Sequence, residues 1–295
     1  MLAEQLAGNL IQGVVLGCVY GAATMGLSLI FGVLRIVNVG HGAFIMVGAY
    51  TALTLFNSLG VNPILAIPVA LLIGLGLGFL FYYLVIQRLI RAPELASLLA
   101  TFAIGLLLEE TVKQVFGSEF RGYNWPVGKV DLWVTVLPMT KVYACAASVL
   151  IAVLLYVWHR KTRAGMAMRS VVEDREGARV CGVDVNRVYA TSFAVGIALT
   201  VASGVLIALF IPVGINPYMG GAFTLKAFVI AVLGGLSSPY GAFFAGVLFG
   251  VIENGSYTLL ATLDGVEPFG LTRALSFVML LVILLIRPTG LFGTK

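Results

Sequence analysis

The sequence predicts an all-α, polytopic membrane protein that forms a single transmembrane domain over residues 1–295. Hydrophobic residues make up 60% of the chain and its mean hydropathy is +1.04, whereas soluble domains are only about 45–50% apolar. Apolar segments also recur along the chain at the length of roughly 20 residues that a bilayer requires. Composition and segment length together predict about eight to nine transmembrane helices, some of them short or broken.

The expected spans are separated by connections, of which those at about 117–140 and 159–187 are the longest. They cover about residues 9–34, 36–59, 63–87, 94–116, 141–158, 188–211, 224–236, 240–256 and 271–287. The segments 224–236 and 240–256 are short and rich in glycine, so we expect broken spans there. Glycines spaced by four, as at Gly13, Gly17 and Gly21, predict faces on which helix backbones pack closely.

Lysine and arginine predict the orientation. If the N-terminus lies outside, twelve of the 18 Lys and Arg face the cytoplasm, and six, Lys226 among them, lie on or near the outer side. We therefore expect a multi-pass protein of the cytoplasmic (inner) membrane, with the N-terminus outside and the C-terminus inside. The opening MLAEQLAG lacks the positive stretch of a cleavable signal peptide, so the first span is expected to be retained. The loop at about 117–140 is then the largest external segment.

One long polar stretch interrupts the apolar chain at 159–187, HRKTRAGMAMRSVVEDREGARVCGVDVNR. Seven of the 18 Lys and Arg fall in it, which assigns it to the cytoplasm. Apolar residues such as Val171 and Val172 recur there at helical spacing, between the helix breakers Gly165 and Gly182. The pattern predicts one short amphipathic helix beneath the membrane that offers a charged face to a soluble partner, and a solvated loop is the alternative.

Several classes of function lack their sequence signals. The chain has no Gly-rich phosphate loop of ATP-binding proteins, no C-x-x-C pair among its three cysteines and no catalytic signature. Its net charge of +5 fits cytoplasmic loops, because no basic stripe interleaved with aromatic residues indicates nucleic-acid binding. We expect no enzymatic activity, no cofactor, no metal site and no nucleic-acid partner, with membrane lipid surrounding the chain.

A weak internal repeat indicates two loosely repeated halves. Gly42-Ala43-Phe44 follows a polar break at 35–41, and Gly241-Ala242-Phe243 follows a break at 234–240. Matching interruptions in two halves indicate a transport pathway, and two unrelated helix breaks are the alternative. Glu253 either borders this pathway or caps a helix end. The candidate pathway residues are Asn38, His41, Gly42, Gly234, Gly235, Ser237, Ser238, Gly241 and Glu253.

Four separated motifs carry a resemblance to one family. Glu176-Gly177-Ala178, followed by Gly182, is similar to the E-A-A-x-x-x-G coupling motif of ABC importer permeases, with Gly177 in place of the first alanine. The stretches LSLIFGVLRIVNVGHGAFIMVGAY, GMAMRSVVEDREGARVCGVDV, VLGGLSSPYGAFFAGVLFGVIEN and RPTGLFG resemble the branched-chain amino-acid permeases of those importers. The resemblance implies a cytoplasmic coupling helix whose ATPase-contacting residues are Arg169, Glu173, Asp174, Glu176, Ala178, Arg179 and Gly182.

By this resemblance the chain is the permease subunit of an ATP-driven importer for leucine, isoleucine and valine that works by alternating access. It would pair with a second homologous permease, two ATP-binding cassette subunits that hydrolyse the ATP, and an extracytoplasmic solute-binding protein. A urea or short-chain amide permease is the alternative within this importer class. A secondary transporter or channel is the alternative from another class. It would normally carry mid-span carboxylates for ion coupling, whereas the acidic residues here are expected near span ends.

Overall fold

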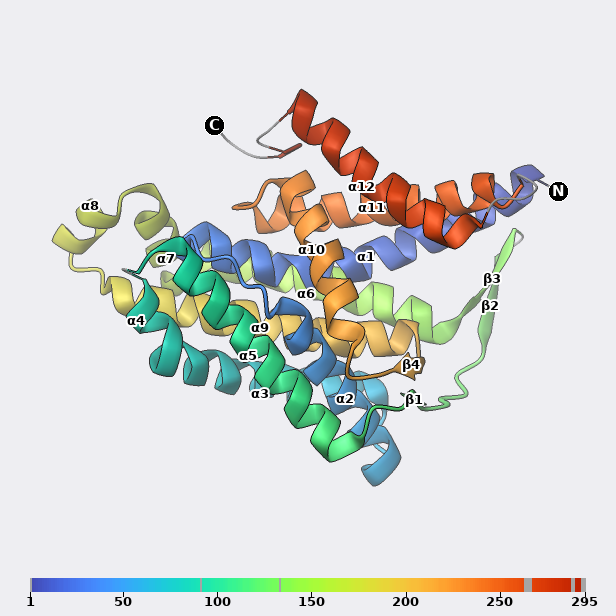
Figure 1. The fold of residues 1–295 in the computed structure, drawn as a ribbon, viewed down its shortest axis with the longest axis horizontal. Coiled ribbons are helices and arrows are strands. Elements are labelled where there is room, and N and C mark those ends of the chain that lie inside the picture. Colours follow the sequence, from blue (N-terminus) through green and yellow to red (C-terminus); the bar gives the residue numbers. More distant parts are fainter. Residues whose placement is uncertain (1, 91, 133, 263–266, 288–289, 293–295) are drawn as a thin grey trace.

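Long apolar helices lie side by side along one axis in a computed structural model that describes residues 2–90, 92–132, 134–262, 267–287 and 290–292 (Figure 1). Among these residues, seven helical segments are long and apolar enough to cross a membrane. They are α1 (Leu2–Leu34), α2 (His41–Leu59), the composite segment Pro63–Leu89, α5 (Glu94–Phe116), α6 (Met139–Lys161), α9 (Val185–Phe210) and α11 (Pro239–Leu260). The shorter apolar helix α10 (Met219–Gly234) and the C-terminal α12 (Pro268–Ile286) complete the set. The predicted all-α polytopic fold is confirmed.

The third span is built from four helical pieces. A 3-10 turn (η1, Pro63–Leu65) leads into α3 (Ala66–Phe81), a π-helical turn (η2, Tyr82–Ile86) and the short α4 (Gln87–Leu89). Tyr82, inside the π-helical turn, is fully buried, and its hydroxyl donates to Asn186 Oδ1 at 2.6 Å. A π-helical turn shifts side-chain direction within a helix. This one brings Tyr82 onto the N-terminal end of α9.

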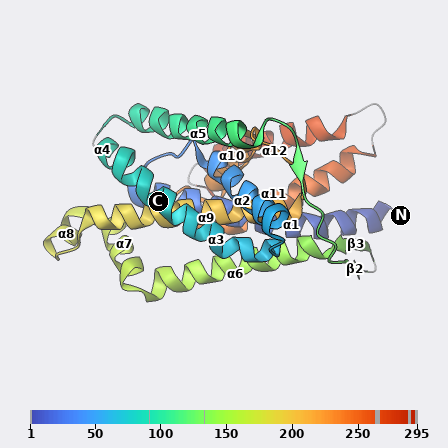
Figure 2. The ribbon, with the colours of Figure 1, turned by 90° about the horizontal axis from the view of Figure 1, so that it is seen from below.

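The core lies around α1 and α9. Helix α9 is buried along most of its length, from Val188 to Phe210, because small and apolar residues occupy every side of it. Helices α3, α5 and α6 instead leave many large apolar side chains exposed on their outer faces, as lipid-facing spans do. Figure 2 shows α5 and α6 on opposite sides of the layer that contains α9.

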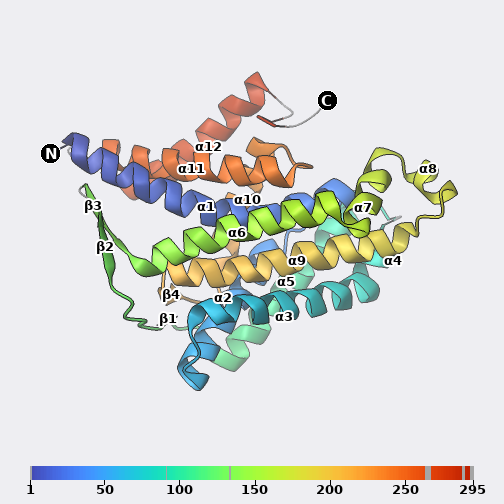
Figure 3. The same ribbon diagram turned by 180° about the vertical axis from the view of Figure 1, so that it is seen from behind.

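Close backbone packing joins α1 to α11, which run side by side in Figure 3. A Cβ atom at Gly17 would lie 2.6 Å from Val247 Cα, and one at Gly13 would lie 2.9 Å from Val251 Cα. The close-packing face predicted from the spacing of these glycines is therefore confirmed. Helix α11 is also longer than the predicted span 240–256, since it continues to Leu260.

The two ends of the bundle differ in structure. The helices that follow α6, namely α7 (Arg163–Glu173) and α8 (Arg175–Val180), extend from one end, and the N-terminus lies at the other (Figures 1 and 3). Short strands, which the sequence did not predict, lie at this second end. They form two antiparallel pairs: β1 (Arg121–Gly122) with β4 (Val213–Ile215), and β2 (Lys129–Leu132) with β3 (Thr135–Pro138). The segments 159–187 and 117–140 thus lie at opposite ends, as the predicted orientation requires.

The loop at the strand-bearing end is packed rather than freely solvated. Tyr123 is buried, and its ring centroid lies 5.1 Å from that of Phe56 on α2. Its backbone N–H donates to the carbonyl of Pro212 at 3.1 Å. Burial raises the pKa of the Tyr123 hydroxyl, because the charged form would lose hydration.

Candidate functional site

The polar stretch after α6 forms two helices, whereas the sequence predicted one. Thr162 caps α7 by accepting from the N–H of Gly165 at 3.1 Å, so Gly165 lies in the first turn and is not a breaker. The break falls at Asp174, whose backbone is extended (φ −147°, ψ 107°). The Asp174 carboxylate accepts from the N–H of Glu176 at 3.0 Å and so starts α8. The chain therefore turns in the middle of the polar stretch.

Apolar and basic contacts fix this helix pair to the bundle. Met168 and Val171 of α7 and Ala178 of α8 are buried in the main core. The guanidinium of Arg169 donates to the backbone carbonyl of His159 at the end of α6. Arg169 and Ala178, both predicted to contact an ATPase, thus also make contacts within the bundle, and their role toward an ATPase stays a prediction.

The remaining predicted coupling residues are exposed on the outer face of α7 and α8, a surface that also carries apolar side chains. Its polar members are Glu173, Asp174, Glu176 and Arg179, and its apolar members are Met166, Val172 and Val180, while Gly182 is exposed just beyond α8. Val172 was expected on the buried face, but two consecutive valines on a helix point in different directions, and Val171 takes the core position. Val180 is 90% exposed, so this face presents apolar as well as charged side chains.

The local structure at and just beyond this face favours glycine at two positions. A Cβ atom at Gly177 would lie 2.5 Å from Asp174 Oδ2, so glycine here leaves room for the capping carboxylate. Gly182 has φ +83°, the left-handed conformation that ends many helices, and its N–H donates to the carbonyl of Arg179 at 3.0 Å. The predicted role of Gly182 as a helix stop is confirmed.

The first predicted break connects α1 to α2. Arg35 takes a left-handed conformation (φ 58°), and α2 begins only at His41, whereas the predicted span began at 36. Asn38 and His41 are fully buried, and Asn38 Nδ2 has no hydrogen-bond partner among the described residues. Thr101 of α5 satisfies the non-helical backbone by accepting from the N–H of Val39 at 3.1 Å. Such backbone persists within a membrane protein only where protein surrounds it or a cavity adjoins it.

The start of α2 crosses the start of α10. The N–H of Gly42 donates to Thr224 Oγ1 at 2.8 Å, and a Cβ atom at Gly42 would overlap the carbonyl oxygen of Gly220. The contact is reciprocal, since a Cβ atom at Gly220 would lie 2.9 Å from the carbonyl carbon of Gly42. A third Gly-Ala-Phe triplet, Gly221-Ala222-Phe223, directly follows the contact residue Gly220, but Gly221 itself takes no part in the crossing.

The second predicted break connects α10 to α11. Gly235 has φ +92°, and Ser238 caps α11 by accepting from the N–H of Gly241 at 3.1 Å. Gly234 and Gly241 face each other across this turn. Ser237 is exposed near the end of α1, where its carbonyl oxygen lies 3.0 Å from a Cβ built at Gly32. The close neighbours of Gly241 thus differ from those of Gly42, and the two breaks do not pack against each other through these glycines.

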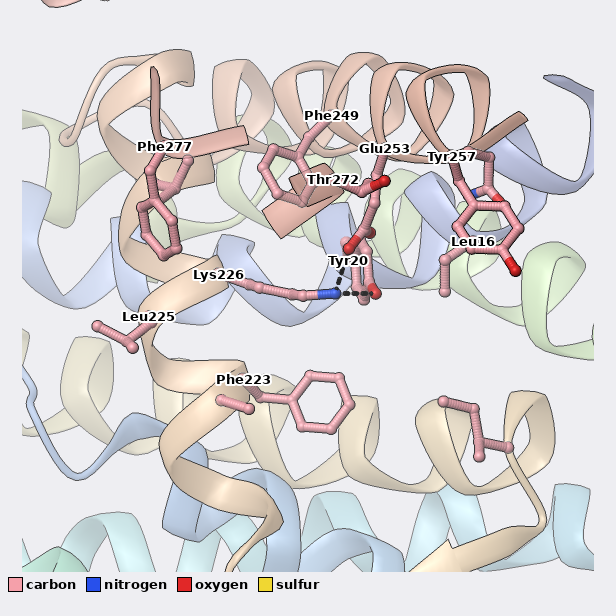
Figure 4. Close-up of a pocket in the computed structure, with 14 residues that line it drawn as sticks. Leu16, Tyr20, Phe223, Leu225, Lys226, Phe249, Glu253, Tyr257, Thr272 and Phe277 are labelled. Atoms are coloured by element: carbon pink, nitrogen blue, oxygen red, sulfur yellow. Dashed lines mark hydrogen bonds and ion pairs between the residues drawn. The ribbon is translucent and has the colours of Figure 1, made fainter. Parts of the chain in front are cut away.

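Glu253 does not end a helix, as the sequence had suggested, but lies inside α11. Its carboxylate oxygen Oε1 is 2.6 Å from Nζ of Lys226, which lies inside α10 rather than near the outer side (Figure 4). Lys226 also donates to the hydroxyl of Tyr20 on α1 at 2.7 Å. Both charges are mostly buried, so each is tolerated because the other neutralises it. Among the described residues, no cluster of three His, Cys, Asp or Glu side chains could hold a metal ion.

Comparisons with known proteins cover nearly the whole chain. The family described as branched-chain amino acid transport system / permease component matches residues 9–285. The high-affinity branched-chain amino acid transport system permease protein LivH of Salmonella typhimurium (strain LT2) is 29% identical, over 97% of this chain and 94% of LivH. The permease protein LivM of the same system and organism is 28% identical, over 78% of this chain and 59% of LivM.

A solved structure has a similar fold. PsaBC from Streptococcus pneumoniae, in complex with Fab, matches with a TM-score of 0.53 over 98% of this chain and 97% of that one. The sequence identity is 17%, so the similarity concerns the arrangement of helices alone.

Proposed function

Because the chain belongs to the branched-chain amino acid transport system permease family, we propose that it is the permease subunit of an ATP-driven importer that carries branched-chain amino acids across the cytoplasmic membrane. One observation carries the proposal, namely the family match over residues 9–285. The fold agrees with it, because the membrane helices are joined at one end of the bundle by the exposed helices α7 and α8, which present both charged and apolar side chains. The permease itself has no enzymatic role in this proposal.

The proposed assembly contains a second permease, two ATP-binding cassette subunits and an extracytoplasmic solute-binding protein. Similarity to both LivH and LivM of one organism supports a second permease of the same kind. The outer face of α7 and α8 supports an ATPase contact, since exposed apolar side chains such as Val180 stand among charges there. In this arrangement α7 and α8 face the cytoplasm, the N-terminus lies outside and the C-terminus inside.

Contacts at the cytoplasmic end offer a mechanical route from the ATPase to the permease. Arg169 ties α7 to the carbonyl of His159 on α6, and His159 Nδ1 lies 2.8 Å from the hydroxyl of Tyr240 in the first turn of α11. Tyr240 directly follows the turn at 235–238 that separates α10 from α11. Movement of α7 would therefore act on this turn, and the ATPase cycle would bias the permease between inward-open and outward-open states.

We propose that the interrupted segments border the solute pathway. Asn38 supports this, since its buried amide has hydrogen-bonding capacity that no described residue uses. Glu253 supports it as well, because intramembrane charges generally mark solute routes. The full proposed set is Asn38, His41, Gly42, Gly234, Gly235, Ser237, Ser238, Gly241 and Glu253.

Reconstitution tests the function against its alternatives. The assembled importer would be placed in liposomes with its solute-binding protein, and uptake of labelled leucine, valine and urea would be measured with and without ATP. We expect ATP-dependent accumulation of leucine and valine. Accumulation of urea alone would favour the amide permease. Uptake by this chain alone, without ATP, would favour a secondary transporter, for which the intramembrane Glu253 is the relevant feature.

Cysteine labelling tests the orientation. Asn124 and Arg163 are both exposed, at opposite ends of the bundle. In a background without the native cysteines, we expect an impermeant thiol reagent to label Asn124→Cys from outside and Arg163→Cys only from the cytoplasm. Labelling of both from one face would refute the orientation.

A further inference from the structure

A cavity of about 530 Å³ lies between α1, α10, α11 and α12 (Figure 4). This volume falls within the range of pockets that hold small molecules, roughly 300–1,000 Å³. Apolar side chains form most of its wall, including Leu16, Phe223, Val229 and Phe249. Pockets of this type bind an apolar body and use a few polar groups to orient it.

The charged side chains among the residues that line this cavity are one cation and one anion, contributed by different helices. Figure 4 shows Lys226 of α10 and Glu253 of α11 pointing toward one another beside Tyr20 of α1. Lys226 Nζ donates to Glu253 Oε1 at 2.6 Å and to the Tyr20 hydroxyl at 2.7 Å. The second carboxylate oxygen, Glu253 Oε2, is buried with no hydrogen-bond partner among the described residues. It therefore retains the capacity to accept from a cationic donor.

Stability alone is a weak reason for such a pair. Two charges must lose their hydration to enter the interior, and replacing a buried ion pair with apolar residues of similar size is often neutral or stabilising. The Lys226–Glu253 pair also faces a cavity, whereas a purely structural pair would be expected to sit in packed surroundings. An ionisable pair inside a membrane domain points to an interaction with solute.

We propose that this cavity binds one free α-amino acid in its zwitterionic form, an inference that rests on the proposed transport function. The Lys226 ammonium receives the α-carboxylate, and the Glu253 carboxylate receives the α-ammonium. The apolar wall around Phe223 and Phe249 receives the aliphatic side chain. The two protein charges separate to admit the solute, and each gains an opposite charge in exchange.

Charge balance gives this site its specificity. The ion pair is neutral before binding, the zwitterion is neutral, and the complex is neutral, so no net charge is buried at any stage. Urea carries neither charge and could not replace the contact that Lys226 and Glu253 lose when they separate. Leucinamide lacks the carboxylate and 4-methylpentanoate lacks the ammonium, so each would leave one buried charge unpaired. The site therefore favours apolar α-amino acids over all three.

The main test removes both charges together. The double variant Lys226→Met/Glu253→Gln keeps the side-chain sizes and leaves no unpaired charge. Its matched control is Lys113→Met/Glu110→Gln, which removes an ion pair of 3.1 Å on the exposed surface of α5. In the reconstituted importer we expect the first variant to reach normal membrane levels. Its leucine uptake should fall about tenfold or more, while the control transports normally.

Leucine uptake by the Lys226→Met/Glu253→Gln variant within twofold of wild type would overturn the site and leave the proposed function standing. Failure of the wild-type importer to take up leucine would overturn the proposed function and the site with it. If the double variant does not insert into the membrane, Ala222→Phe provides the test of the site, because Ala222 lines the cavity and carries no charge. Filling the cavity should lower the ratio of leucine to alanine uptake about tenfold, and an unchanged ratio would overturn the site.

Discussion

The crossing of α2 and α10 at Gly42 gives the most quantitative prediction. In Gly42→Ala the new methyl group would overlap the carbonyl oxygen of Gly220, so the two helices must move apart. Overpacking of this kind costs about 1–3 kcal/mol. Separation would also lengthen the 2.8 Å hydrogen bond from the Gly42 N–H to Thr224 Oγ1, which contributes about 1 kcal/mol. The expected loss in free energy of unfolding is therefore about 2–4 kcal/mol, or roughly 30- to 700-fold in the folding equilibrium.

Thermal unfolding of the purified protein in detergent and leucine uptake in proteoliposomes measure this effect. Gly221→Ala is the matched control, because Gly221 lies next to Gly220 on α10 and a Cβ atom there meets nothing within 4 Å. We expect the control to stay within about 0.5 kcal/mol of wild type. Gly220→Ala should resemble Gly42→Ala, because its Cβ atom meets the same crossing from the other side. A Gly42→Ala protein with wild-type unfolding temperature and uptake would refute the reasoning.

The remaining predictions concern the cytoplasmic end of the bundle. Glu176→Lys removes an exposed 3.0 Å ion pair with Arg179, so we expect normal membrane insertion and little change in stability. Fewer ATPase subunits should co-purify with this variant, and co-purification at the wild-type level would contradict a role of Glu176 in docking. Gly182→Val forces a β-branched residue into a left-handed conformation, at a cost of about 1–2 kcal/mol, and should weaken ATPase association. Gly128→Val carries comparable strain (φ +80°) in the loop between β1 and β2, at the opposite end, and should not weaken it. Tyr240→Phe removes the hydrogen bond to His159, and we expect ATPase association to be retained while leucine uptake slows. An equal loss of ATPase association and of uptake would argue against a role of this contact in transmitting movement from α7 to α11.

The sequence alone determined the class of fold, because the signals involved are local. The bounds predicted for the fourth span, 94–116, agree with α5, since a run of apolar residues with charges at its ends specifies a span directly. The helix stop at Gly182 was predictable for the same reason, because it depends on the conformational freedom of one residue. The polar stretch 159–187 likewise could not lie in hydrocarbon, whatever its partners.

Only the tertiary structure decided where the charges within the spans belong. In sequence, a lone Lys226 or Glu253 resembles the end of a span, because an unpaired charge inside a membrane is costly. The two residues are 27 positions apart and lie on different helices, so their mutual neutralisation becomes visible only when α10 and α11 are placed side by side. The direction of Arg169 was hidden in the same way, since its partner is a backbone carbonyl that helical periodicity does not reveal.

The contacts between breaks were also decided by tertiary structure. The repeated Gly-Ala-Phe triplets suggested that Gly42 and Gly241 play matching roles, but Gly42 packs against Gly220, whereas Gly241 packs against Gly234 and Phe292. A glycine in the sequence shows that a backbone can come close, but not which backbone comes close. That partner is fixed by how α2 and α10 cross, which depends on the packing of the whole bundle.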